Sequence, residues 1–333
     1  MSTSSIALDV MGGDAAPAVT VAGALAACAP DGALGIPPER VLLVGEQSRI
    51  EALLDERGGN PGFPLRHASQ AIGMGEAPGQ ALRAKPDSSI AGCVQAIRTG
   101  DAGAMVSMGN TGACVGAATL GLGTLAGVRR PGIAVTLELT GTPLTLLDMG
   151  ANIATQAQDL RQYAAMGCVY LRDCLGVRDP RVGLLNVGEE KGKGPQLLKD
   201  AYSLLSDSDL HFVGNVEGSD LFRGVCDVVV TDGFTGNVVL KLLEQFSGFL
   251  LGLVMRELSE HEVDWARDAL AHVRRSIDYS TYGGALLLGV RGVVIIGHGR
   301  SDEAAVANAI ALACRAVDAG INGHIEQGLA LSP

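Results

Sequence analysis

The stretch DSSIAGCVQAIRTGDAGAMVSMGNTG, residues 87–112, contains a helix, a strand and a polar junction in direct succession. Apolar residues recur at three- and four-residue spacing from Ile90 to Ile97, which predicts a helix with one apolar face over Ser88–Arg98. An aspartate and a serine stand at its start as capping residues, and Gly100 stands where a C-terminal glycine is expected. Ala104–Ser107 then has the composition of a short buried strand. A helix that leads directly into such a strand is typical of an α/β fold.

Short apolar runs alternate with longer helical patterns along almost the whole chain, which predicts an α/β fold with a largely parallel sheet and helices on both faces. Strands are expected at Ile6–Val10, Val41–Val44, Ala104–Ser107, Ile133–Leu139, Leu144–Met149, Val182–Val187, His211–Val213, Val225–Val230 and Val293–Ile296. Neither a repeat nor a Pro/Ser-rich linker is evident, so we expect one domain over residues 1–333. Two successive helical patterns without a strand predict a helical hairpin over residues 237–279 that projects from the sheet.

The composition limits the class of protein. Hydrophobic residues make up 47% of the chain and charged residues 18%, which suits a sizeable core and is too apolar for disorder. Lys and Arg number 25 against 36 Asp and Glu, a net charge of −11, which disfavours nucleic acid as a partner.

Cysteine usage and the N-terminus favour a soluble cytoplasmic protein. The seven cysteines are scattered and form no C-x-x-C motif, which is typical of buried, reduced thiols rather than a zinc or redox site. The N-terminus lacks the basic region of a signal peptide. Charges or glycines interrupt the apolar stretches, so we expect no segment of the ~20 residues that a membrane span needs.

Six predicted strands end in small polar residues and glycines, and in a parallel sheet these junctions lie together at the carboxyl edge, where ligands bind. Glycines there let backbone N–H groups approach an anion, and helix N-termini favour negative charge. One such loop is a common connector, but six predict a small anionic or phosphorylated ligand. The candidate binding residues are Gly12, Gly13, Asp14, Asn110, Thr111, Gly112, Asn152, Asn186, Gly233, Thr235, Gly236 and His298.

The familiar catalytic and cofactor motifs are incomplete in this sequence. Gly194 follows Lys193 where a Walker A loop has Ser or Thr, and the other glycine clusters miss the dinucleotide spacing. We therefore expect no cofactor and no metal. An enzyme whose second substrate is itself a nucleophile, such as inorganic phosphate, needs only an anion site, an oxyanion donor and alignment. Lys193, in a glycine-rich junction, is the predicted cation, whereas Lys191 is expected to be a solvated surface charge.

Several segments together resemble the bacterial phosphate acyltransferase family, PlsX. They are Ile6-Ala-Leu-Asp-Val-Met-Gly-Gly-Asp14, Ala81-Leu-Arg-Ala-Lys-Pro-Asp-Ser-Ser89, Ser107-Met-Gly-Asn-Thr-Gly-Ala113, Leu147-Asp-Met-Gly-Ala-Asn152, Gly183-Leu-Leu-Asn-Val-Gly-Glu-Glu190, Val230-Thr-Asp-Gly-Phe-Thr-Gly-Asn237 and Tyr282-Gly-Gly-Ala285. The resemblance extends from Ile6 to about Ala319. It implies transfer of a fatty acyl group from acyl carrier protein to inorganic phosphate, giving acyl phosphate for phospholipid synthesis. It also implies a homodimer and a fold like that of the isocitrate and isopropylmalate dehydrogenases.

Residues and resemblance together favour direct attack of phosphate on the thioester. Phosphate is expected among the backbone N–H groups of residues 109–112 and 233–236, with Lys193 nearby. The side-chain amide of Asn110 or Asn237 is a candidate oxyanion donor. Asp232 either orients Lys193 or binds the pantetheine arm, or it only caps the turn that follows it. The predicted catalytic residues are therefore Lys193, Asp232 and Asn237.

Three departures from the family pattern stand out: Lys191 replaces an acidic or neutral residue, Arg300 replaces a small one, and the hairpin is shorter and less basic. Two other functions stay open from sequence, an NAD(P)-dependent dehydrogenase of the same fold and a non-catalytic acyl-carrier or lipid-surface scaffold.

Two partner surfaces are predicted. A basic patch of Arg83, Lys85, Arg129 and Arg130 is expected to receive the acidic carrier protein. The apolar face that runs from Leu242 to Val254 is expected to form the dimer interface, since only Arg274-Arg275 forms a basic cluster for anionic lipid. Weak peripheral contact with the inner face of the membrane, through the hairpin tip near Trp265, is the alternative.

Overall fold

The computed structural model describes residues 5–30, 32–260 and 279–330, and these divide into two compact units. Unit 1 combines the chain up to Pro131 with the segment from Tyr282 onward, and unit 2 runs from Gly132 to Thr281. Compact packing units do not by themselves test whether the chain folds as one domain, so the single-domain expectation stays a prediction.

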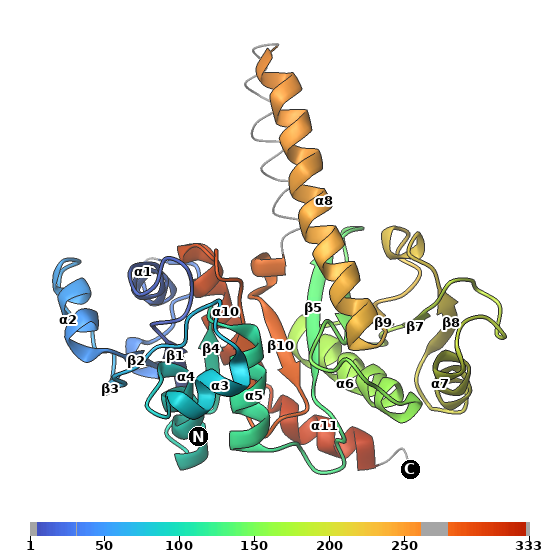
Figure 1. Cartoon of the computed structure of the whole chain (residues 1–333), viewed down its shortest axis with the longest axis horizontal. Helices are drawn as coiled ribbons and strands as arrows, with labels where there is room; N and C mark the ends of the chain where they lie inside the picture. Colours follow the sequence, from blue (N-terminus) through green and yellow to red (C-terminus); the bar gives the residue numbers. More distant parts are fainter. Residues whose placement is uncertain (1–4, 31, 261–278, 331–333) are drawn as a thin grey trace. The chain divides into compact units, whose positions relative to one another are not determined.

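Unit 1 is a six-stranded, mainly parallel sheet with the strand order β3-β2-β1-β4-β11-β10 (Figure 1). The strands are β1 (Ile6–Asp9), β2 (Val41–Gly45), β3 (Leu65–His67), β4 (Ala104–Ser107), β10 (Ala285–Leu288) and β11 (Val293–Ile296). β10 is antiparallel to β11, whereas β3, β2, β1, β4 and β11 are parallel to their neighbours in this order. Every residue of β1, β4 and β11 is buried, so both faces of the sheet are covered.

The helices of unit 1 are α1 (Ala18–Ala27), α2 (Gln47–Asp55), α3 (Pro78–Ala84), α4 (Ser89–Thr99), α5 (Thr111–Leu122), α10 (Glu303–Asp318) and α11 (Ile321–Ala330). α4 confirms the helix predicted over Ser88–Arg98. The Ser88 hydroxyl accepts a hydrogen bond from Ala91 N at 3.3 Å, and Gly100 ends the helix with a left-handed φ of 80°.

Unit 2 has a five-stranded sheet with the order β5-β6-β9-β7-β8. Its strands are β5 (Gly132–Glu138), β6 (Pro143–Leu147), β7 (Val182–Leu185), β8 (Phe212–Val216) and β9 (Val228–Val230). β5 and β6 form an antiparallel pair, whereas β6, β9, β7 and β8 are parallel to one another. Helices α6 (Ala157–Leu175), α7 (Gln196–Ser206) and α8 (Gly233–Glu260) complete the unit, and short 3-10 helices occur at Pro38–Arg40, Asp220–Phe222 and Tyr279–Tyr282.

Helix α8 begins four residues earlier than the hairpin predicted from the sequence, and runs unbroken from Gly233 to Glu260 (Figure 1). Residues 261–278, with Trp265 and the rest of the hairpin, lie outside the described residues, so the hairpin itself stays a prediction.

Helix α8 also corrects a sequence-based expectation. Its segment Gly233–Leu258 is long and apolar enough to cross a membrane, and little of it is buried. The expectation that every apolar stretch is too short is therefore wrong for this helix, because one Lys and one Glu are its only charges before Arg256. Helices α10 and α11 reach this length and apolar character only when taken together, as a pair bent by 52°. Most of α10 is buried in the core of unit 1.

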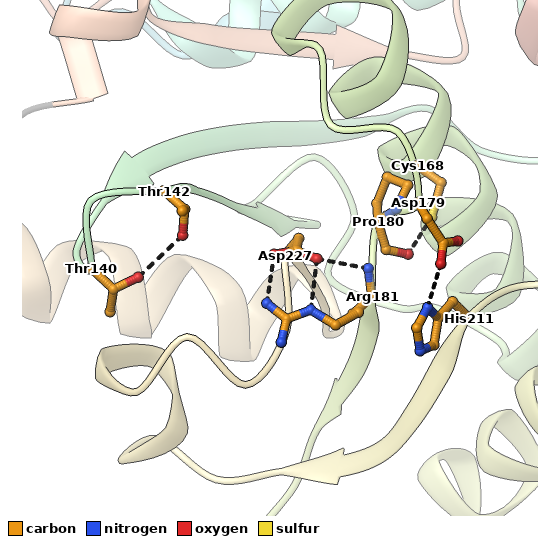
Figure 2. A network of polar contacts seen from close by, with 8 residues as sticks. All are labelled: Thr140, Thr142, Cys168, Asp179, Pro180, Arg181, His211 and Asp227. Atoms are coloured by element: carbon orange, nitrogen blue, oxygen red, sulfur yellow. Dashed lines mark hydrogen bonds and ion pairs between the residues drawn. The ribbon is translucent and has the colours of Figure 1, made fainter.

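The amino ends of β7 and β9 are joined by an ion pair in unit 2 (Figure 2). The Asp227 carboxylate accepts hydrogen bonds from Arg181 N, Nε and Nη2 at 2.8, 3.0 and 2.9 Å. Burial raises the pKa of Asp227, but the hydrogen bonds and charge of Arg181 outweigh it, and the pKa lies below 3.8. The pair therefore holds two neighbouring strands in register.

We predict that Asp227→Asn lowers the free energy of unfolding at pH 7 by about 1–2 kcal/mol, because a partly exposed charged hydrogen-bond pair is lost. A carboxyl group with a lower pKa in the folded chain stabilises the fold above pH 3.8, and this stability is lost as the pH falls through the folded pKa. Urea unfolding should therefore separate wild type and variant at pH 7, and the difference should shrink as the pH falls below 3.8 and through the folded pKa of Asp227.

Asp179→Asn is the matched control, since Asp179 forms an exposed 2.8 Å pair with His211 nearby and should contribute little (Figure 2). An Asp227→Asn deficit of the same size at both pH values would contradict the ionic origin of the effect.

Candidate active site

Three of the predicted junctions of unit 1 meet at the carboxyl ends of β1, β4 and β11. Asp14 N donates to Gly299 O at 2.7 Å, which joins the loop after β1 to the loop after β11. A side chain at Gly12 would lie 2.8 Å from Gly109 N and would overlap the Asp9 carboxylate, so only glycine fits there. Half-buried His298 accepts a hydrogen bond from Arg300 N at its Nδ1, and so orders its own loop.

A buried carboxylate lies beneath these loops. Ser107 Oγ donates to Asp9 Oδ2 at 2.6 Å and accepts from Gly109 N at 3.0 Å. Burial raises the pKa of Asp9, although hydrogen bonds from Ser107, Ser89 and the Met11 backbone oppose the rise. Asp9 is in a motif quoted from the sequence, but its supporting role was not predicted.

Asn110 holds its own junction together. Its Oδ1 accepts from Ala113 N at 3.0 Å and caps α5, while its Nδ2 donates to the carbonyl oxygens of Met74 and Glu76 at 3.1 and 3.0 Å. The oxygen and the nitrogen of the Asn110 amide are thus both engaged in hydrogen bonds to the backbone. The first N–H groups of a helix lack intrahelical partners, and Thr111 and Gly112 of α5 are exposed. Backbone N–H groups are therefore the better anion donors at this junction.

In unit 2 the start of α8 packs onto the loop after β6. Asp148 is buried, and its carboxylate accepts hydrogen bonds from the N–H groups of Ile133, Gly150, Ala151 and Asn152 at 2.9–3.1 Å. Burial raises its pKa in spite of these bonds. A side chain at Gly233 would lie 2.7 Å from the Asp148 Oδ2, and one at Gly236 would overlap the Asp148 carbonyl oxygen.

Asp232 caps α8, as one of the three sequence interpretations proposes. Its Oδ1 accepts from Thr235 N at 2.9 Å and its Oδ2 from Thr235 Oγ1 at 2.7 Å. Asn152 donates through Nδ2 to Tyr163 Oη at 2.9 Å, whereas Asn237 is exposed on the first turns of α8. The side chains of Asn110 and Asn152 are buried, so Asn237 is the one of these three asparagines whose amide faces solvent.

The loop between β7 and α7 carries Lys193. Asn186 Nδ2 donates to Lys193 O at 3.1 Å, and Asn215 Nδ2, from the end of β8, donates to Glu190 O at 2.9 Å. The two amides fix the loop from neighbouring strands. Lys193 is exposed and its ammonium lies 3.8 Å from the Glu190 carboxylate.

The structure separates the two lysines of this loop. Lys191 Nζ lies 5.5 Å from the centre of the Tyr202 ring, in a cation–π contact, and Tyr202 itself packs edge-on against Phe212. Both lysines are exposed, but Lys191 contacts Tyr202 of α7, whereas Lys193 lies near Glu190 of its own loop. Asn215 was missed from sequence; its place after a predicted strand is the signal that could have identified it.

The predicted residues are divided between the two units. Gly12, Gly13, Asp14, Asn110, Thr111, Gly112 and His298 belong to unit 1, and Asn152, Asn186, Lys193, Asp232, Gly233, Thr235, Gly236 and Asn237 to unit 2. A single phosphate site built from residues 109–112 and 233–236 stays a prediction. Within the described ranges, no group of His, Cys, Asp and Glu could hold a metal ion.

Solved structures with the same architecture define the class of fold. The phosphotransacetylase of Streptococcus pyogenes superposes with a TM-score of 0.60 at 18% identity, over 95% of this chain and 94% of that chain. A 4-hydroxythreonine-4-phosphate dehydrogenase from Klebsiella pneumoniae gives 0.51 at 16% identity, over 97% and 100%. At such identities the likeness concerns the fold alone, and it confirms the predicted dehydrogenase-like α/β class.

Sequence comparison gives the family. The family model described as "Fatty acid synthesis protein" matches residues 4–324. Curated proteins named phosphate acyltransferase are 43% identical in Heliobacterium modesticaldum, over 96% of this chain and 97% of the relative, and 42% identical in Acidobacterium capsulatum, over 98% and 97%. The chain belongs to this fatty acid synthesis protein family, which confirms the resemblance found in its motifs.

We predict that Gly236→Ala destabilises the protein by about 1–3 kcal/mol, the range for a forced steric overlap in a packed interior, because its methyl group would meet the Asp148 carbonyl oxygen. Gly252→Ala on the same helix is the control: a side chain there meets no described atom within 4 Å, so stability should rise by up to about 1 kcal/mol. Urea unfolding followed by circular dichroism gives both values. Equal effects of the two variants would show that α8 is not anchored at Gly236.

Proposed function

We propose that this protein is an enzyme that transfers a fatty acyl group from acyl carrier protein to inorganic phosphate, giving acyl phosphate for phospholipid synthesis. The observation that carries the proposal is the similarity to phosphate acyltransferases along 96–98% of the chain. A dehydrogenase of the same fold has weaker support, since the Klebsiella pneumoniae dehydrogenase shares 16% identity. A non-catalytic scaffold would not need glycine-lined loops at several strand ends.

The state of the thiols supports direct attack by phosphate. Six of the seven cysteines are buried, and burial raises the pKa of Cys28, Cys114, Cys168 and Cys226 to about 12. The pKa values of Cys93 and Cys314 are raised by the same cause. A protonated, buried thiol is a poor nucleophile. An acyl-cysteine intermediate at any of these six positions is therefore disfavoured.

In the proposed reaction a phosphate oxygen attacks the thioester carbonyl carbon. A carbon–oxygen bond forms, the carbon–sulfur bond breaks, and the carrier thiolate leaves and takes a proton from solvent. Backbone N–H groups stabilise the oxygen on which negative charge develops. No covalent enzyme intermediate is needed.

The two helix starts differ as anion sites. The α5 start has a neutral cap, Asn110, and exposed residues at Thr111 and Gly112, whereas the α8 start is capped by the Asp232 carboxylate. Because a carboxylate repels phosphate, the α5 start is the preferred place for phosphate.

We also propose a docking surface for the acidic carrier protein. Lys85, predicted to belong to it, donates to Glu76 Oε1 at 2.5 Å and Ala71 O at 2.7 Å, and so serves the loop of residues 71–76. Arg83, Arg129 and Arg130 are exposed and remain the basic residues of the proposed surface.

A homodimer formed through α8 completes the proposed assembly. Large apolar side chains are exposed along this helix, among them Leu242, Phe246, Phe249 and Leu250. The proposed location is the cytoplasm, and peripheral contact with the inner face of the membrane is the alternative use of the same surface.

We predict that Lys193→Ala lowers turnover by ~10²-fold, the scale of one lost electrostatic donor, with little effect on folding because the side chain is exposed. Lys191→Ala is the matched control from the same loop and should change turnover little. Release of free thiol and formation of acyl phosphate, measured against phosphate concentration, report the effect. Normal phosphate dependence in folded Lys193→Ala protein would contradict this role.

We predict that the double substitution Phe249→Glu and Leu253→Glu converts a dimer to a monomer, because charges placed on an apolar interface are costly to bury. Light scattering gives the mass in solution, and co-sedimentation of wild-type protein with anionic vesicles tests the alternative. A variant that stays dimeric, together with wild-type protein that pellets with vesicles, would favour the membrane.

A further inference from the structure

Large apolar side chains are exposed at the carboxyl edge of the unit 2 sheet, directly beside polar site residues. They are Ile153, Val187 and Phe234, which are 81%, 79% and 63% exposed. Each follows a predicted site residue in the chain, at the ends of β6, β7 and β9. Single exposed apolar residues are common, but a set gathered at a polar site marks a binding surface.

The topology places these residues on one side of the sheet. β9 lies between β6 and β7, and all three strands are parallel, so their carboxyl ends meet at the same edge. The backbone segments that carry Ile153 and Phe234 approach each other closely. Gly233 packs so tightly on the Asn152 carbonyl oxygen that a side chain there would overlap it, and Ile153 and Phe234 are the next residues of these two segments.

Helix α8 extends the apolar surface away from the site. Val238 is 54% exposed and lies one turn beyond Phe234, on the same helix face. Four residues advance the helix by ~6 Å. We call the four residues Ile153, Val187, Phe234 and Val238 the apolar strip. It begins at buried polar side chains and continues along a helix that projects from the sheet of unit 2 (Figure 1).

We propose that the apolar strip binds the hydrocarbon chain of the acyl donor and thereby places the thioester carbonyl at the loops of residues 148–152 and 232–237. This inference rests on the proposed function. A ligand for this surface must have a polar reacting end and an apolar remainder, because the site has polar groups at one end only. A fatty acyl thioester has this form.

The charges on α8 support the same occupant. The charged residues of its first five turns are Lys241 and Glu244, and they pair with each other at 2.8 Å. A surface for anionic lipid would instead present clustered Lys or Arg. The part of the strip on α8 is therefore neutral as well as apolar, which suits an uncharged alkyl chain.

The test compares donors that differ only in chain length. The value of kcat/KM is measured with palmitoyl and butyryl thioesters of acyl carrier protein, at saturating phosphate, by acyl phosphate formation. In Ile153→Ser/Phe234→Ser protein the palmitoyl-to-butyryl ratio should fall on the order of tenfold, since burial of one large apolar side chain has that worth in binding. Phe234→Leu should retain most of the ratio.

Phe222→Ser is the matched control, because Phe222 is also in unit 2 and is 55% exposed but lies in the short helix Asp220–Phe222, which contains no predicted site residue. Its ratio should equal that of wild type. Serine is well tolerated at loops and helix starts, so the single variants Ile153→Ser and Phe234→Ser are expected to fold. Circular dichroism checks the folding of the single variants, which replace the double variant if it does not fold.

Three outcomes would overturn the proposal, and they are distinguishable. Wild-type protein that forms no acyl phosphate from either donor would refute the proposed function and this inference with it. An active wild type whose ratio is unchanged by the substitutions would refute the acyl-chain site alone. An unchanged ratio with loss of the dimer, or of binding to phosphatidylglycerol vesicles, would assign the strip to a second subunit or to lipid.

Discussion

Two buried carboxylates, Asp9 and Asp148, organise the loops at the carboxyl ends of the parallel strands. Asp9 is the last residue of β1, and Asp148 directly follows β6. Each accepts hydrogen bonds from backbone N–H groups of the loop after it; Asp148 accepts three such bonds and a fourth from Ile133 N of β5. Buried backbone donors must find partners, and a carboxylate satisfies several of them at once. Burial raises the pKa of both groups, and these hydrogen bonds oppose the rise. The glycines that pack against the two carboxylates, Gly12 and Gly233, are dictated by this arrangement.

Periodicity and strand length made most of the fold predictable from the sequence. All nine predicted strands are present, and Ala104–Ser107 and Val293–Ile296 have the predicted bounds. Two strands were missed for physical reasons. β3 has three residues, none of them fully buried, and so has no apolar run to detect. β10 consists of one alanine and three leucines, which are strong helix formers, and the sheet overrides that preference.

The candidate site was predictable in its residue types but not in their individual roles. Small polar residues after strands identified Asn110, Asn186 and Asp232, yet the sequence does not say where an amide or carboxylate points. Asn110 has both ends of its amide engaged in the loop, and Asp232 caps α8. Asn215 was missed although it follows the predicted strand, which ended at Val213; in the structure it lies inside β8, which extends to Val216. Such roles depend on long-range contacts that spacing along the chain does not encode.

Burial of the thiols affects how readily the compounds of the proposed reaction would acylate the protein's own cysteines. Thioesters and acyl phosphates are acylating agents, and a thiolate near them would itself become acylated. Burial raises the pKa of Cys114, beside the Ser107 junction, to about 12, so this thiol is protonated at neutral pH. Burial of Cys114 therefore does more than fill the core behind α5. It protects the protein from self-acylation by the activated compounds that its proposed reaction consumes and releases.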